Sequence, residues 1–300
     1  HRFLFAQLKE LAHEHDLEPL IFTFDRHPRE VLTGVSPAML TTSMERQHLL
    51  ALHAEVRVLD FADVQTLTAE QFMQYLHEQE NVDILLMGYD HRFGSDQLKG
   101  FSEYEKVARR VGMRVERAHE CLVDGLPVSS TRIRKLLHEG QMKEVNRLLG
   151  YKYSLSGVVE HGNGIGKQIG FPTANIRIQS NKLLPMSGVY SAQALVDGKS
   201  IVAIVNVGNN PTVGNDKISV ESHLIDFYGD LYSKEVVLNF DLFIRSEKKF
   251  DDSRKEKSNG VTTGADTPEI HCSRAAGRLT PNYLAALASR MRALRRWARR

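Results

Sequence analysis

The chain contains 300 residues, of which 42% are hydrophobic and 25% are charged. This ordinary globular composition excludes a wholly disordered or collagen-like chain, and at roughly 150 residues per domain the length predicts two domains. The net charge of +2 is unevenly distributed, because the last 50 residues carry +6 and the first 250 carry −4. A nucleic-acid-binding protein with a basic folded face is therefore not indicated.

Strand and helix patterns alternate along the first 150 residues. Strands are predicted at 20–24, 56–59 and 82–87, and a further strand begins at Arg114. Helices are predicted from the first residues onward and near 43–53, 68–80, 101–111, 130–137 and 142–149. Strands that alternate with helices favour a parallel, doubly wound sheet.

The pattern changes after Gly150, where we place a domain boundary. Between Tyr153 and Arg245 the chain shows short alternating runs at 154–159, 189–196, 201–207, 219–227 and 235–243. Gly, Pro, Asn and Asp separate these runs. Short, evenly spaced strands with turn residues between them favour a β-barrel or a sandwich.

Residues 252–300 form an atypical basic tail, in which a polar stretch precedes a helical pattern rich in arginine. We interpret it as a disordered linker followed by a helix. A frameshift, fusion or chimeric origin is our leading explanation. The alternative is a real amphipathic helix that docks on the body or on an anionic surface.

The sequence contains no run near the ~18 apolar residues of a membrane span, and no secretion signal at its start. Its two cysteines, Cys121 and Cys272, are far apart and form no CxxC motif. Neither a disulfide framework nor a zinc site is indicated. We therefore expect a cytoplasmic protein that binds neither membrane nor nucleic acid.

Two loops follow predicted parallel strands, one containing Asp25 and His27 and the other containing Asp90. The carboxyl edge of a parallel sheet is where open α/β folds bind ligands. Ordinary loop residues are the alternative interpretation for each. The scattered histidines show no metal-ligand spacing such as HExxH.

A hydroxyl-rich turn at Ser129–Thr131 precedes a predicted helix. Free backbone N–H groups and the helix dipole at such a start favour an anion, and Arg134 can add charge-assisted bonds to phosphate. A simple N-cap followed by solvated arginines is the alternative.

A glycine-rich stretch runs from His161 to Asn175 and includes a lysine. Glycines let the backbone bend closely around phosphates, while Thr173 and Asn175 offer oxygen ligands suited to Mg²⁺. A turn between two strands explains the glycines equally well. Glu221, in a later strand, could accept a proton from an attacking hydroxyl, or it could simply face outward.

Six motifs, in order along residues 1–251, resemble the signatures of bacterial bifunctional riboflavin kinase/FAD synthetase. These motifs are Thr23–Pro28, Gly88–Gly94, Ser129–Arg134, Gly170–Asn175, Gly208–Thr212 and Val220–Glu221. The resemblance implies a transferase with a Rossmann-like nucleotidyltransferase domain (1–150), which converts FMN to FAD. A Greek-key β-barrel (151–251) that phosphorylates riboflavin to FMN with ATP and Mg²⁺ would follow it.

The resemblance also implies site residues. In the barrel, Glu221 would be the catalytic base, and Thr173 and Asn175 would hold Mg²⁺ and ATP phosphates. The other barrel residues expected to bind ATP are Gly162, Lys167 and Gly170. In the first domain, the expected residues are His1 as a catalytic histidine, with Ser130, Thr131, Arg134, His27 and Asp90 at the ATP phosphates.

The sequence departs from the family pattern at its start, where His1 resembles the second histidine of a His-x-Gly-His motif. The family's first strand, which would be central in the sheet, precedes that motif. We therefore expect impaired adenylylation of FMN by this chain. The alternative function is a non-catalytic nucleotide- or flavin-binding module. A basic RNA-associated protein is a third reading, which would require salt-sensitive binding by residues 290–300.

Overall fold

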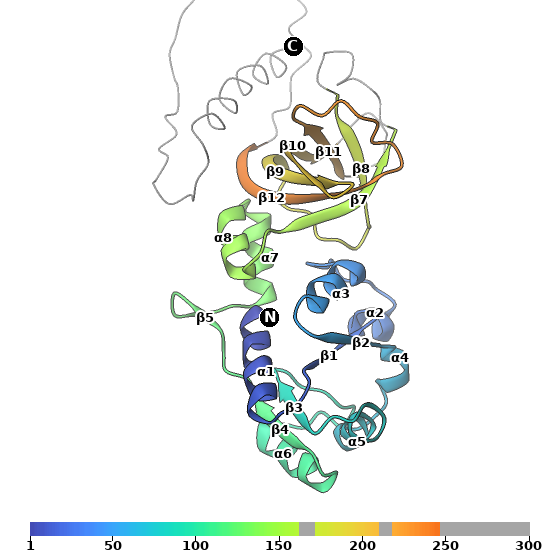
Figure 1. Ribbon diagram of the computed structural model, residues 1–300, viewed down its shortest axis with the longest axis vertical. Coiled ribbons are helices and arrows are strands. Elements are labelled where there is room, and N and C mark those ends of the chain that lie inside the picture. Colours follow the sequence, from blue (N-terminus) through green and yellow to red (C-terminus); the bar gives the residue numbers. More distant parts are fainter. Residues whose placement is uncertain (162–171, 210–217, 247–300) are drawn as a thin grey trace, which may run out of the picture. The chain divides into compact units, whose positions relative to one another are not determined.

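The computed structural model describes residues 1–161, 172–209 and 218–246 (Figure 1). All helices and strands named below belong to one compact unit, which comprises His1–Asn163 and Thr173–Glu247. The helices are α1 (Arg2–Glu14), α2 (Pro28–Thr33), α3 (Ser43–Ala51), α4 (Phe61–Val64), α5 (Ala69–Glu80), α6 (Phe101–Arg110), α7 (Ser130–His138) and α8 (Met142–Leu149). The strands before residue 150 are β1 (Leu20–Phe24), β2 (Glu55–Leu59), β3 (Ile84–Met87), β4 (Arg114–Arg117), β5 (Leu122–Val123) and β6 (Leu126–Pro127).

The predicted parallel pairing of the first half is confirmed. Strand β1 pairs in parallel with β2, and β3 pairs in parallel with β4. The two pairs form separate two-stranded sheets among the described residues.

Helices α5 and α6 share a hydrophobic core with β3 and β4. Met73 and Leu76 on α5 and Tyr104 on α6 are among its fully buried side chains. Capping boxes at Thr42 and Thr68 begin α3 and α5, because each threonine hydroxyl accepts a backbone N–H bond and each threonine amide donates one in return to the side chain of Glu45 or Gln71. These local signals explain why both helices begin where the sequence predicts.

The second half is a closed barrel, as predicted, with strand order β10-β11-β8-β7-β12-β9 (Figure 1). Neighbours such as β7 and β12 are distant in sequence, as in Greek-key connections. Its strands are β7 (Ser154–Glu160), β8 (Ala174–Ile178), β9 (Gly188–Val196), β10 (Lys199–Asn209), β11 (Ile218–Leu224) and β12 (Glu235–Ser246). Strand β8 was not predicted as a strand.

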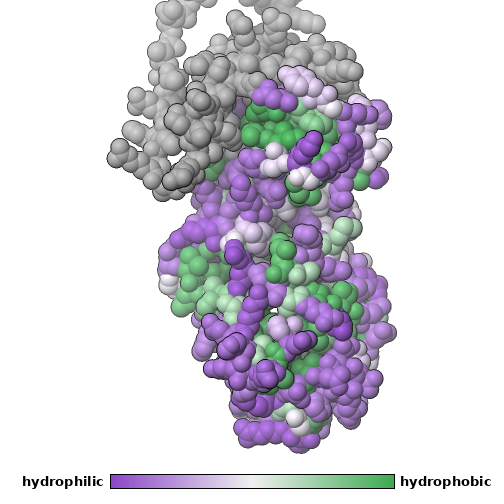
Figure 2. Space-filling view, viewed as in Figure 1, coloured by the Kyte–Doolittle hydropathy of each residue, from purple (hydrophilic) through white to green (hydrophobic). Residues whose placement is uncertain are grey.

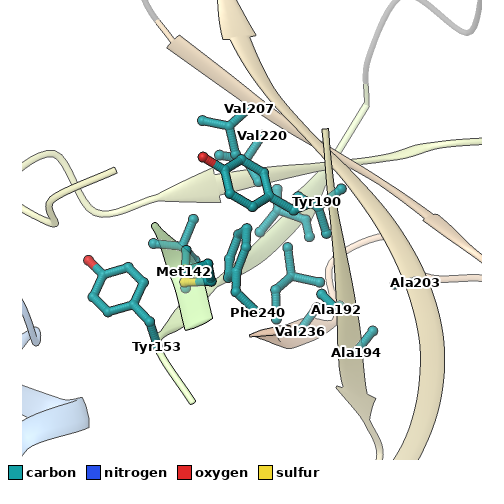
Figure 3. Close-up of a cluster of buried hydrophobic side chains, with 14 of the residues drawn as sticks. Met142, Tyr153, Tyr190, Ala192, Ala194, Ala203, Val207, Val220, Val236 and Phe240 are labelled. Carbon is teal, nitrogen blue, oxygen red and sulfur yellow. The ribbon is translucent and has the colours of Figure 1, made fainter. Parts of the chain in front are cut away.

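Alternate residues of the barrel strands fill its interior. Figure 3 shows part of this buried hydrophobic core, in which the rings of Tyr190 and Phe240 pack edge to face with their centroids 5.2 Å apart. Val207 on β10 and Val220 on β11 belong to the same core. Because inward residues alternate with outward ones, their neighbours on each strand face away from the core.

Helices α7 and α8 pack into the barrel core rather than into the core of α5 and α6. Asn146 on α8 fixes the chain between helix and barrel, because its Nδ2 donates to the Phe240 carbonyl (2.9 Å) and its Oδ1 accepts from the Tyr153 amide (2.8 Å). These two part-buried hydrogen bonds hold α8 against β12 and against the residue that precedes β7.

The face seen in Figure 2 is mostly hydrophilic, with smaller hydrophobic areas between polar side chains. Within the described part of the chain, no helix combines the length and hydrophobicity needed to span a membrane.

Candidate active sites

Strand pairing brings the predicted base and the predicted metal ligand together. Glu221 on β11 is the direct antiparallel partner of Asn175 on β8. Directly opposed residues lie on the same face of a sheet, with Cβ atoms about 5 Å apart. The sequence alone could not establish this contact, because it depends on which strand is the neighbour of β11.

The face that Glu221 and Asn175 share is the outer face of the barrel. On β8, Ala174 and Ile176 are buried in the core, so Asn175 between them faces outward and is only partly buried. Thr173, two residues before Asn175, is also partly buried. Since side chains alternate along an extended chain, Thr173 lies on the same side as Asn175.

The register extends this site to two residues that the sequence analysis did not identify. Asn206 on β10 is the direct partner of Glu221, and Glu160 on β7 is the direct partner of Asn175. Asn206, Glu221, Asn175 and Glu160 therefore form a row across four adjacent strands. The alternation of side chains along a strand could have predicted that each of these residues lies on an outer face. Only the strand pairing shows that they are neighbours.

The donor set of this row fits a magnesium ion that is held together with a nucleotide. Hydroxyl, amide and carboxylate oxygens are the ligands that Mg²⁺ prefers, and it commonly takes one or two from protein and others from phosphates and water. Among the described residues, no group of three or more His, Cys, Asp or Glu could hold a metal without such help. The oxygens of Thr173 and Asn175 are thus suited to a metal that arrives with ATP, and the Glu221 carboxylate lies beside Asn175.

Three of the predicted ATP-binding residues, Gly162, Lys167 and Gly170, lie outside the described residues. His161, just before that stretch, stacks on Tyr232 with ring centroids 3.8 Å apart. Tyr232 lies in the connection between β11 and β12.

The hydroxyl-rich turn before α7 has the predicted capping role. Ser129 is the N-cap, and its side chain accepts a hydrogen bond from the Arg132 amide (3.2 Å). Ser130 and Thr131 are exposed in the first turn of the helix. The N–H groups of this turn and the positive end of the helix dipole are suited to phosphate.

Positively charged side chains act electrostatically on His27, which is the N-cap of α2. Burial lowers the pKa of His27, and the guanidinium groups of Arg46 and Arg134 lower it further, together with Arg29, while Glu30 opposes the shift. Arg46, on α3, was not identified from the sequence. Arg46 belongs to no sequence motif. It lies in the first turn of a capped helix, and only the structure shows that strand β1 is beside it.

Asp90 and His1 are exposed. Asp90 follows β3, as predicted, and His1 precedes α1 without a side-chain capping bond. Within the described ranges, no hydrogen bond or ion pair joins either residue to His27, Thr131 or Arg134. Their roles remain predictions.

Comparison with known proteins bears directly on these two sites. Residues 1–132 match the family model for FAD synthetase, and residues 149–257 match that for riboflavin kinase. A bifunctional riboflavin kinase/FMN adenylyltransferase of Pseudomonas fluorescens is 34% identical over 257 residues, which cover 83% of this chain and 82% of that protein. The chain belongs to the bifunctional riboflavin kinase/FMN adenylyltransferase family.

Other members of this family are similar over comparable lengths. The Haemophilus influenzae protein of the same name is 32% identical over 273 residues, covering 88% of each chain. A solved structure from Streptococcus pneumoniae, described as a macrolide-efflux protein, superposes with a TM-score of 0.73 at 28% identity and covers 83% of each chain. That likeness supports the fold.

Proposed function

We propose that the barrel of this chain phosphorylates riboflavin to FMN and that its α/β half adenylylates FMN to FAD. Membership of the family supports both activities. The observation that carries the first is the direct pairing of Glu221 with Asn175 on the outer face of the barrel. We assign residues 1–150 to the adenylyltransferase domain and 151–251 to the kinase domain.

In the proposed kinase reaction, Glu221 accepts the proton of the terminal ribityl hydroxyl. The oxygen attacks the γ-phosphorus of ATP, the bond to the β-phosphate oxygen breaks, and ADP leaves. Phosphoryl transfer needs chiefly alignment and neutralisation of charge. Thr173 and Asn175 would hold Mg²⁺, which supplies charge neutralisation at the phosphates. Asn206, opposite Glu221, can orient the carboxylate from the other side.

In the proposed adenylyl transfer, the first turn of α7 and the cations around His27 bind the phosphates of ATP. An FMN phosphate oxygen attacks the α-phosphorus, and pyrophosphate leaves. Ser130, Thr131 and Arg134 supply neutral and charged donors for the departing oxygens. Because ATP is a substrate of both reactions, we place the protein in the cytoplasm.

The experiment is an incubation of the purified chain with riboflavin, ATP and Mg²⁺, followed by separation of the flavins. Formation of FMN that is lost in Glu221→Ala supports the proposed kinase. Binding of riboflavin and ATP without FMN would instead support a non-catalytic binding module. FAD formation is measured in the same assay.

A further inference from the structure

Lys182 is a buried cation that neither proposed reaction uses. It lies between β8 and β9, and only 1% of its side chain is exposed. Its ammonium group is 2.5 Å from a carboxylate oxygen of Glu45 and donates to the Leu40 carbonyl at 2.7 Å. The ring of Tyr153 lies 4.7 Å from it. A buried charge is costly unless it is paired, so this lysine needs Glu45.

Glu45 belongs to α3, in the other half of the chain. One of its carboxylate oxygens accepts the Thr42 amide of the capping box (2.9 Å) and also the Lys182 ammonium. Its other oxygen accepts the hydroxyl of Ser156 on β7 at 2.8 Å. Two side chains of the barrel half, Lys182 and Ser156, therefore bind the same carboxylate that belongs to the capping box of α3.

The chain just before α3 is also bound to the barrel through its backbone. Met39 donates its amide to the Asn181 carbonyl (2.6 Å) and accepts the Leu183 amide (2.8 Å). These bonds form a parallel bridge between Met39 and Lys182. The Asn181 side chain adds a bond to the Ser36 hydroxyl at 3.2 Å. Residues 36–46, which we call the docking segment, are thus held by the barrel along their length.

The docking segment also contacts the proposed adenylyl-transfer site. Arg46, next to Glu45 in the sequence, donates to the Phe24 carbonyl at the end of β1 (2.6 Å). Arg134 on α7 donates to the Ala38 carbonyl. Phe24 is followed by the loop that contains His27, and both arginines act electrostatically on that histidine.

Glu45 and Arg46 are adjacent in the first turn of α3. Glu45 is bonded to the barrel, whereas Arg46 is bonded to the carbonyl at the end of β1. We propose that Lys182 is a positioning residue for adenylyl transfer: its ion pair with Glu45 holds the docking segment so that Arg46 and Arg134 stay beside His27. The assignment of that site rests on the proposed function, whereas the mechanical coupling does not.

Lys182→Met tests this coupling in the full chain, because methionine keeps much of the length and removes the charge. We expect amide hydrogen exchange in the docking segment to accelerate at least ~10-fold, since its anchor to the barrel is lost. We also expect the pKa of His27, measured by NMR, to rise, because Arg46 and Arg134 lower it and would move away. Glu30 and Arg29 remain on α2 in both proteins.

A milder variant and a matched control complete the experiment. Ser156→Ala removes one bond to Glu45 without a buried unpaired charge, and it should shift both readouts in the same direction by a smaller amount. If Lys182→Met does not fold, the amide exchange and the His27 titration of Ser156→Ala decide whether the contact of Glu45 with the barrel positions the docking segment. Lys234→Met is the control, because its ammonium is also 2.5 Å from a carboxylate, that of Asp197, but is 41% exposed on the barrel. It should change neither readout.

Unchanged exchange and an unchanged His27 titration in folded Lys182→Met, or in Ser156→Ala if that variant alone folds, would overturn the proposal and leave Lys182 as a stabilising residue only. Neither readout requires turnover, so a failure of the flavin assay would count against the proposed function and not against this coupling. In variants that fold, FMN formation should remain within about twofold of the parent chain, because Lys182 is outside the row of Glu221 and Asn175.

Discussion

Glu221 and Asn175 are direct cross-strand partners on β11 and β8, on the outer face of the barrel. They are 46 positions apart in sequence, yet the register makes their side chains neighbours. A carboxylate and an amide in this relation can serve different ends of one reaction. In the proposed kinase reaction, the carboxylate would receive a proton from the acceptor hydroxyl, and the amide oxygen would help to hold the metal-bound phosphates.

Replacement of Asn175 by Ala should weaken the binding of MgATP. We expect the KM for ATP in FMN formation to rise about tenfold, because one oxygen ligand or charge-assisted contact is lost. Initial rates at several Mg²⁺ concentrations measure this change, and excess Mg²⁺ should recover part of it. Arg177→Ala is a matched control on the same strand and face. An equal rise in KM for that variant would contradict a specific role for Asn175.

Ser222→Ala should not destabilise the protein. The Ser222 side chain is fully buried in the barrel, and its hydroxyl makes no hydrogen bond to any residue that the structure describes. Since a buried hydroxyl without a partner costs about 1 kcal/mol or more, its removal should raise the free energy of unfolding by about that amount. Urea denaturation measures the effect. Ser219→Ala, which loses a bond to the Gly208 carbonyl (3.1 Å), should instead be destabilising.

Binding of ATP at the α/β site should be accompanied by proton uptake below pH 7. Burial and the nearby arginines keep the pKa of His27 below its ordinary value of about 6.5, so the free imidazole is neutral at pH 7. Bound phosphates would raise that pKa, and affinity should therefore increase as the pH falls through this window. Calorimetry in two buffers with different ionisation enthalpies measures the protons taken up.

His27→Asn is the control for this prediction, because asparagine can still cap α2. The difference in proton uptake between the parent chain and this variant isolates the histidine from the second ATP site. Equal uptake in both proteins would show that His27 does not face the phosphates.

Much of the fold was predictable because its strands and helices carry local signals. The run that became β1, from Leu20 to Phe24, is apolar and ends at a charged loop, and the helix that became α5 has a capping box at Thr68. Strand β8 was missed because its first two residues, Ala174 and Asn175, belong to a motif that suggests a phosphate loop. The β5–β6 hairpin was also missed, although Asp124 and Gly125 between its strands are a strong turn signal.

The candidate sites were only partly predictable. Motifs identified Glu221, Asn175 and His27, since each belongs to a distinctive local pattern. Asn206 was assigned to the barrel site because its register places it opposite Glu221, and Arg46 was assigned to the second site because it contacts the end of β1. Pairing and packing between distant segments determine both, and a single sequence does not encode such distances in a local pattern.

The most direct test of this account is FMN formation by the parent chain and by Glu221→Gln, with riboflavin, ATP and Mg²⁺ at saturating concentrations. Glutamine keeps the size and the strand pairing but cannot accept the proton, so kcat should fall by about 10²-fold or more, while Glu235→Gln, an exposed glutamate on β12, should be unaffected. Turnover by Glu221→Gln at the parent rate would contradict the assignment of the catalytic base.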